Sequence, residues 1–263
     1  MERKFPLGTK LSEQKAKRYV DELAQSMLRR SEQKVLNGRF MTALSSGELP
    51  REGLRVFWLN WHGFVAEINN FIQCAYQRHL GFFKKHPLLY GAFADKVADE
   101  LIHPKPPGHI LVVWEQGEIF GLTKDEMVDY EMLPKCRALI EWHRSMLYEG
   151  TMVEFWSSIL WEEAVGHWAK QFREGLTKYG HGTEEAPYFT THEEADLEVH
   201  EGGVMAHGEF NKAVLSTLLQ EGYVETRPGY SIVYCTETSL DLFAHFLDTC
   251  YEAVALESKA KAV

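Results

Sequence analysis

The sequence lacks the features that mark membrane-spanning, disulfide-rich and nucleic-acid-binding proteins. No apolar run approaches the roughly 20 residues that a helix needs to cross a bilayer. A net charge of −10 at pH 7 argues against nucleic acid or an anionic membrane as a partner. The cysteines are scattered, with no Cys-x-x-Cys pair, which favours free thiols in a reducing cytosol over a disulfide frame or a structural zinc site. They are Cys74, Cys136, Cys235 and Cys250.

Internal repeats, Ser/Gly-rich linkers and an apolar leader are also missing. A length of 263 residues suits one large core, so we expect a single helical domain over residues 1–263. The first residues, Met-Glu-Arg-Lys-Phe-Pro-Leu-Gly, do not contain the apolar stretch of a signal peptide. We therefore expect a cytoplasmic protein.

Helical patterns fill most of the sequence. An N-terminal helix is expected within residues 1–38, where Asn37-Gly38 reads as its end. A long helix over residues 50–80 is so rich in apolar residues that we expect it at the centre of the fold. The other expected helices cover residues 40–44, 88–102, 109–120, 134–148, 153–179, 191–221 and 239–256, with a short one from residue 123. Together they predict an all-α bundle of about eight to ten helices.

Residues 223–236 do not follow a helical pattern. Apolar and β-branched residues flank Arg227-Pro228-Gly229, which is compatible with a short hairpin or with an ordered loop before the C-terminal helix. We favour the loop, because a lone hairpin is marginally stable.

The segment over residues 191–201 suggests a metal site. His192, Asp196 and His200 follow one another at four-residue steps, so on a helix they would share an arc of about 80°. Imidazole nitrogens and carboxylate oxygens together suit iron, manganese or zinc. The alternative is a solvated polar face, because five of these eleven residues are Asp or Glu.

A second group of donors flanks the proline-rich segment 104–108. Glu100 ends one expected helix and His109 begins the next. His103, at Glu-x-x-His spacing from Glu100, competes with His109 as a ligand, and both histidines could instead cap helix ends at the surface. We favour His109 because the apolar residues that follow it bury the helix that it opens.

Further acidic residues lie on apolar helices, where facing helices of a bundle could hold a metal. Glu162 and Glu163 stand among aromatic residues, and a carboxylate there is costly unless it is paired or metal-bound. We expect one of the two to face inward and the other to face water. Glu67 is an additional candidate ligand, or else a buried charge paired with a neighbouring histidine. His207 is a candidate to replace or support a ligand.

Taken in order, Glu…His…Glu…His-x-x-x-Asp…His resembles the haem-oxygenase-like di-metal oxidases, within the superfamily of TenA-type thiaminases and PqqC-type quinone-forming oxidases. The phrase Tyr-Phe-Thr-Thr-His-Glu-Glu-Ala-Asp, ending at Asp196, is similar to the metal-binding helix of that family. Gly175-Leu176 followed by Tyr179-Gly180 resembles the stretch after the middle glutamate of the family, and the distance from this stretch back to Glu162 selects Glu162 over Glu163. The resemblance covers roughly residues 40–200.

This resemblance implies a haem-oxygenase/TenA-like bundle with a di-iron site, for which manganese or a site that is empty as isolated is the alternative. One metal would take Glu100, His109, Glu162 and His200, and the other would take Glu162, His192 and Asp196, with Glu162 bridging. Most members have the last histidine one residue earlier, where this chain has Val199. A single π-bulge would realign His200 with the other ligands.

The implied activity is oxidation of a small organic substrate by O₂, carried out by a homodimer. Aromatic residues could line an apolar pocket or simply pack the core, and they are Phe57, Trp58, Trp61, Phe64, Trp156 and Trp161. Two metal-free relatives compete with this interpretation: a TenA-type thiaminase or aminopyrimidine hydrolase with a nucleophilic cysteine, and a PqqC-type cofactorless oxidase that uses histidine acid–base chemistry. A third hypothesis is a non-catalytic binding bundle.

Overall fold

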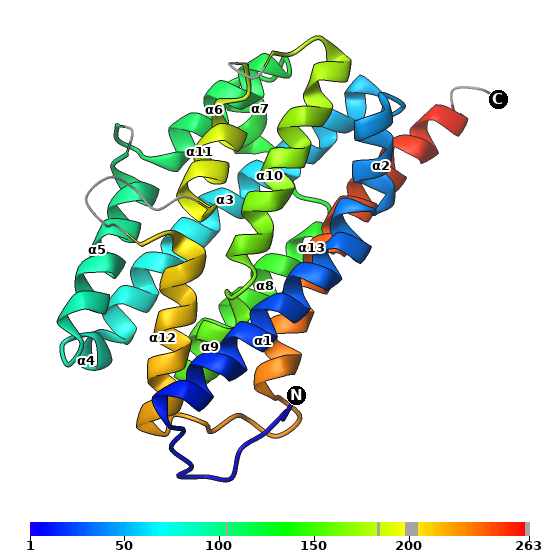
Figure 1. The fold of residues 1–263 in the computed structure, drawn as a ribbon. Coiled ribbons are helices and arrows are strands. Elements are labelled where there is room, and N and C mark those ends of the chain that lie inside the picture. The colour runs from blue at the N-terminus through cyan, green and yellow to red at the C-terminus, as the bar shows by residue number, and fades with distance from the viewer. Residues whose placement is uncertain (104, 183–184, 198–204, 261–263) are drawn as a thin grey trace.

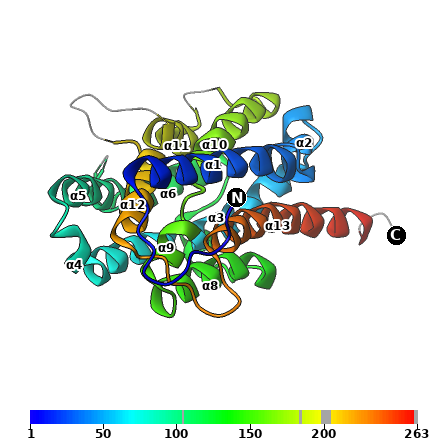
Figure 2. The same ribbon diagram turned by 60° about the horizontal axis from the view of Figure 1, so that its bottom comes forward.

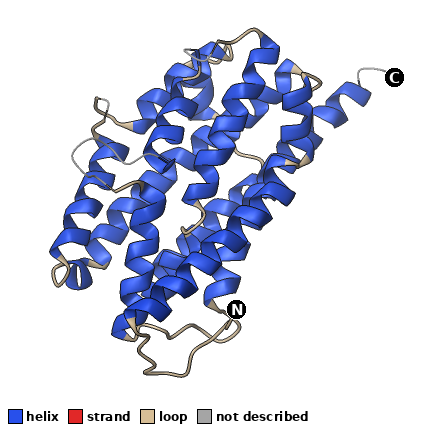
Figure 3. Cartoon of the chain, in the orientation of Figure 1, coloured by secondary structure: helices blue, strands red, loops and turns tan. Residues whose placement is uncertain are grey.

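The computed structural model describes residues 1–103, 105–182, 185–197 and 205–260, leaving aside the side chains of 194–197 and 256–260. Every regular element in these ranges is a helix (Figure 3), which confirms the predicted all-α class. No helix of this part of the chain is long and apolar enough to span a membrane.

The helices of the N-terminal half fall close to the predicted ranges. They are α1 (Glu13–Ser31), which continues as a short π-helix (Glu32–Leu36), α2 (Arg39–Ser46), α3 (Arg51–Arg78), α4 (Leu80–Phe83), α5 (Pro87–Leu101) and α6 (His109–Ile119). Ser12 caps α1, because its side chain accepts a hydrogen bond from the backbone N–H of Lys15. Gly47 ends α2 in the left-handed conformation, at φ 77°, which a glycine adopts without strain.

In the C-terminal half, two long helices that the sequence predicted are each divided into two. The helices described in this half are α7 (Lys124–Asp129), α8 (Pro134–Tyr148), α9 (Met152–Ser158), α10 (Glu162–Leu176) with a 3-10 turn (Thr177–Tyr179), α11 (Pro187–Leu197), α12 (His207–Glu221) and α13 (Ile232–Ala260). The expected helix over 153–179 breaks between α9 and α10, where the side chain of Asn211 donates a hydrogen bond to the carbonyl oxygen of Ile159 at 3.0 Å. The expected helix over 191–221 is α11 and α12. The count therefore exceeds the predicted eight to ten.

α3 runs through the middle of the bundle, as the sequence predicted (Figure 1). In the view of Figure 2, α1, α10 and α11 lie on one side of α3, and α8 and α13 lie on the other. Aromatic rings fill the space between them. The ring of Trp61 on α3 lies 5.1 Å from that of Trp168 on α10 and 5.6 Å from that of Phe243 on α13. Burial of such large side chains, at about 1.5–3 kcal/mol each, is the main force that joins the two sides to α3.

A loop connects α12 to α13 and contains no strand among its described residues, which confirms the preferred loop over the hairpin. The loop is shorter than predicted, because Ile232 to Cys235 already belong to α13. Ser231 begins that helix by accepting a hydrogen bond from the backbone N–H of Tyr234 at 3.0 Å.

The carboxylate of Glu154, which is 0% exposed, anchors this loop to α9. It accepts hydrogen bonds from the backbone N–H of Arg227 at 2.5 Å, from the Nε of Arg227 at 2.8 Å, and from the backbone N–H of Thr151 at 3.2 Å. A carboxylate at this depth is tolerated because its charge is compensated by a cation and by directed N–H groups.

We predict that Arg227→Ala lowers the free energy of unfolding by about 2–4 kcal/mol, because it leaves the Glu154 carboxylate buried without its counter-charge. Chemical denaturation measures this loss. Arg18→Ala is the matched control: its ion pair with Glu22 is exposed, so the expected change is within about 0.5 kcal/mol. Equal effects of the two substitutions would show that the anchor is not needed for stability.

Candidate functional site

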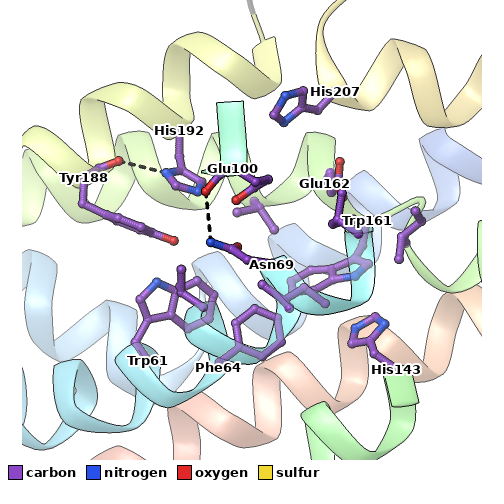
Figure 4. Close-up of a pocket in the computed structure, with 15 residues that line it drawn as sticks. Trp61, Phe64, Asn69, Glu100, His143, Trp161, Glu162, Tyr188, His192 and His207 are labelled. Atoms are coloured by element: carbon purple, nitrogen blue, oxygen red, sulfur yellow. Dashed lines mark hydrogen bonds between the residues drawn. The ribbon is translucent and has the colours of Figure 1, made fainter. Parts of the chain in front are cut away.

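A cavity of about 70 Å³ lies against the middle of α3. Six α3 residues line it at steps of three and four, which places them on one face of the helix: Trp61, Phe64, Val65, Ile68, Asn69 and Ile72. The remaining lining residues come from five other helices and from the break between α9 and α10: Glu100, His143, Ile159, Trp161, Glu162, Val165, Tyr188, His192 and His207. Figure 4 shows two ends. Glu100, Glu162, His192 and His207 gather at one, which we call the acidic end, while Trp61, Phe64 and His143 lie at the other.

The proline-rich turn after α5 brings Glu100 and His109 together. Gly108 has φ 73°, and a Cβ atom there would lie 2.2 Å from the carbonyl oxygen of Glu100, so the turn closes only with glycine. Asn69 donates to the same carbonyl at 3.3 Å. As a result, His109 opens α6 with its Nδ1 3.1 Å from a carboxylate oxygen of Glu100. This approach is not aligned as a hydrogen bond, so the contact is mainly electrostatic.

The histidines around Glu100 determine its charge. Burial favours the neutral acid, but the positive charges of His109, His207 and His192 outweigh burial and lower the pKa of Glu100 from 4.5 to about 2. Burial also works against the charge on His109, yet Glu100 outweighs it and raises the pKa of His109 above its usual value. The pair is therefore a carboxylate beside an imidazole that readily takes a proton.

Glu162 is the inward member of its acidic pair. It is the first residue of α10 and lines the cavity, whereas Glu163 binds Lys212 of α12 at 3.1 Å. The carboxylate of Glu162 is in close contact with the ammonium group of Lys96, which is only 2% exposed. Lys96 was not among the residues predicted from the sequence.

The orientation of His192 is fixed by a backbone carbonyl of its own helix. Its Nδ1 lies 3.1 Å from the carbonyl oxygen of Tyr188, one turn back on α11, and a carbonyl can only accept, so Nδ1 carries the proton. Histidine ligands in metal sites are commonly oriented by such a backbone carbonyl. The ring centroid lies 4.9 Å from that of His109.

The other predicted ligands take different places. His207 begins α12 and lines the cavity, with its Nε2 3.3 Å from Asp99. His103 is exposed after α5, away from the cavity. Glu67 forms ion pairs with two arginines of α8: Arg137, and Arg144 at 2.8 Å. Its partners are therefore arginines and not the neighbouring histidine that the sequence suggested. The side chain of Asp196 and all of His200 lie outside the described residues.

The structure thus brings Glu100, Glu162 and His192 to one end of one cavity, and His109 lies beside Glu100 and His192 without lining it. Within the described part of the chain, no three His, Cys, Asp or Glu side chains stand close enough together to hold a metal ion. The carboxylate of Glu162 contacts the ammonium group of Lys96 instead of other possible metal ligands. The donor types and their burial still fit a metal such as iron, because imidazole and carboxylate are its preferred protein ligands outside clusters and haem.

His143 lines the cavity and was not identified from the sequence. It stands on α8 among positions that bury apolar residues, and the ring is 0% exposed. Neither ring nitrogen has a hydrogen-bond partner, and burial lowers the pKa of His143 to about 3, so the ring is neutral. It stacks on Trp161 at 6.0 Å. Of the six aromatic candidates, Trp61, Phe64 and Trp161 line the cavity, and the other three pack the core.

The sequence matches no protein-family profile and no curated protein. Solved structures do resemble this chain. A TenA homologue from P. horikoshii OT3 is 11% identical, with a TM-score of 0.63 over 90% of this chain and 98% of that one. A domain of unknown function with a haem oxygenase-like fold from Shewanella denitrificans is 15% identical, with a TM-score of 0.66 over 94% and 95%. A TenA homologue from Pseudomonas syringae is 13% identical, with a TM-score of 0.64 over 96% and 99%. These likenesses show the haem oxygenase-like, TenA-like fold that the sequence predicted.

Gly108→Ala should lower the free energy of unfolding by at least about 2 kcal/mol, because the new Cβ strains the backbone and collides with the Glu100 carbonyl. Gly91→Ala is the control, since it lies in α5 with open space around it and should be neutral or stabilising by up to about 1 kcal/mol. Chemical denaturation distinguishes the two. A fully stable Gly108→Ala protein would contradict the tight turn.

Buried neutral histidines should make stability fall on acidification. The pKa values of His143 and His79 are lowered by burial to about 3 and about 4, so between pH 6.5 and about 4 the unfolded chain binds protons that the folded chain does not. Each histidine should then contribute a slope of about 1.4 kcal/mol per pH unit to the free energy of unfolding. His143→Leu should remove one such slope, measured by urea denaturation at several pH values. An unchanged slope would mean that His143 is protonated in the fold.

Proposed function

We propose that this protein is a metal-dependent oxidase that uses O₂ to oxidise a small organic substrate held in the cavity. The observation that carries the proposal is the convergence of carboxylates and imidazoles from α5, α6, α10 and α11 at the acidic end, next to an apolar space. Iron is the proposed metal. Its proposed ligands are Glu100, His109, His192 and Glu162, with Asp196 and His200 as the sequence-derived additions.

Iron bound by such ligands supplies the capacity to bind and reduce O₂. The chain's own residues provide the surroundings. The Tyr188 carbonyl fixes the orientation of His192, and Asn69 fixes the end of α5 that carries Glu100. The rings of Phe64 and Trp161 exclude bulk water from the apolar part of the cavity. Lys96 neutralises Glu162, and a metal that takes this carboxylate has to displace the lysine.

The TenA homologues of the same fold raise the alternative of a metal-free thiaminase. That chemistry needs a nucleophilic cysteine, and the described residues that line the cavity include no cysteine. Cys136 and Cys250 are buried with their sulfurs 3.8 Å apart, and burial raises the pKa of Cys250 well above its usual value. A PqqC-type oxidase without metal is the stronger rival, because three histidines line the cavity.

Protein treated with a chelator and then loaded anaerobically with Fe(II) should bind up to two irons per chain, measured by metal analysis after desalting. Glu162→Gln should lose most of this iron, because an amide lacks the charge that holds the metal. Glu163→Gln makes the same change one residue away, on a side chain that binds Lys212, and should keep the iron. Absence of iron in the wild type, or full iron in Glu162→Gln, would reject the proposal. Substrate oxidation by chelator-treated protein would instead establish the cofactorless mechanism.

A further inference from the structure

Lys96 occupies a position of α5 where the helical pattern calls for an apolar side chain. The buried residues of α5 are Leu89, Phe93 and Lys96, at steps of four and three, so the lysine continues the apolar stripe of this helix. Its side chain is only 2% exposed. A lysine is rarely buried to this extent unless it is paired, because its charge loses the hydration that water provides. A leucine or a methionine would fit the stripe without that cost.

Stability alone does not account for this lysine. Its partner is Glu162, the first residue of α10, whose side chain is 19% exposed. Apolar residues of similar size that replace a buried ion pair are often as stabilising as the pair, because both charges must be desolvated. A charge on each of two facing helices therefore calls for a reason other than the fold, and Glu162 is also a proposed metal ligand.

The two carboxylates of the acidic end have partners of different kinds. Glu100 faces the imidazole of His109 at 3.1 Å, and an imidazole can join a carboxylate as a second ligand of one metal. Glu162 contacts the ammonium group of Lys96. An ammonium group has three donors and no lone pair, so it cannot bind a metal. Lys96 and a metal ion therefore exclude each other at Glu162, whereas no such exclusion exists at Glu100.

A displaced Lys96 has an acidic neighbour on its own helix. Asp99 follows it by three residues on the same face of α5, and the side chain of Asp99 is 28% exposed. The four methylene groups of a lysine allow its charged end to move towards water while the stem stays buried. The ammonium group can thus leave Glu162 for a position beside a partly hydrated carboxylate, without unfolding of α5.

We propose that Lys96 is an internal competitor of the metal at Glu162, and that it keeps this side of the metal site closed until a metal ion displaces it. The inference rests on the proposed metal-dependent function and adds the order of metal loading. Iron that uses Glu100 and His109 binds first, and iron that takes Glu162 binds last and more weakly. Lys96 is a positioning residue, because it acts on the metal only through Glu162.

The test measures iron bound per chain when chelator-treated full-length protein is dialysed without O₂ against increasing Fe(II). Lys96→Met removes the ammonium group and keeps an unbranched side chain on the apolar stripe. We expect the more weakly held iron to bind at least about tenfold more tightly to this variant, because the metal no longer has to break a buried ion pair. Lys212→Met is the matched control. It removes the same charge from a lysine that pairs with Glu163 at 3.1 Å, and should leave iron affinity unchanged.

Stability distinguishes competition from a purely structural role. Without metal, Lys96→Met should unfold at a lower urea concentration than the wild type, because Glu162 keeps its charge and loses its partner. Fe(II) should then raise the urea midpoint of the variant more than that of the wild type. A lysine that only held the fold together would behave differently, since its loss would weaken stability and iron binding together. Lys96→Gln keeps a hydrogen-bond donor for Glu162 without the charge, and should lie between the two proteins in both measurements.

Further outcomes separate this proposal from the proposed function. Adding Glu162→Gln to Lys96→Met should restore the urea midpoint without metal and abolish the gain in iron affinity. Iron affinity that is unchanged or weaker in both Lys96 variants would overturn the competitor role, and two irons in the wild type would still support the oxidase. Iron that binds only to the Lys96 variants would support the competition and count against an iron oxidase in the wild type. Absence of iron from every variant would reject both.

Discussion

The need to compensate two carboxylates inside an aromatic core is the constraint on which this site depends. Glu100 and Glu162 both border the same buried cavity, and an uncompensated charge there would cost several kcal/mol. The fold provides a different cation for each. His109 reaches Glu100 through a turn that only Gly108 permits, and Lys96 of α5 reaches Glu162 of α10 across the bundle. Both solutions use α5, so the placement of that helix against α3 holds the acidic end together.

The break between α9 and α10 has a consequence for both ends of the cavity. It makes Glu162 the first residue of a helix, where the partial positive charge of the helix N-terminus favours a carboxylate. It also turns Trp161 so that its ring stacks on His143 while the neighbouring carboxylate faces Lys96. An unbroken helix would place adjacent side chains about 100° apart around one axis, and the two contacts would not form on opposite sides of one small space.

Much of this arrangement could be predicted from the sequence, and the exceptions have physical reasons. The boundaries of α8 and the choice of His109 over His103 follow from local apolar patterns, which report burial directly. Those patterns left Glu162 and Glu163 open, and the inward direction of Glu162 was expected only from the family resemblance. Lys96 and His143 could not be found in this way. A lysine on a helix reads as solvent-exposed, and its partner lies 66 residues away in the chain. The break at residues 159–161 consists of apolar residues that suit a helix equally well, and it depends on Asn211 from another element.

The two ends of the cavity are chemically unlike. At the acidic end, the Glu162 carboxylate contacts the Lys96 ammonium group and the Glu100 carboxylate faces His109. Lys96 is the group that would have to move for Glu162 to hold a metal. The side of the cavity that Trp61, Phe64 and His143 line is aromatic, and His143 is the titratable group that the described residues place there.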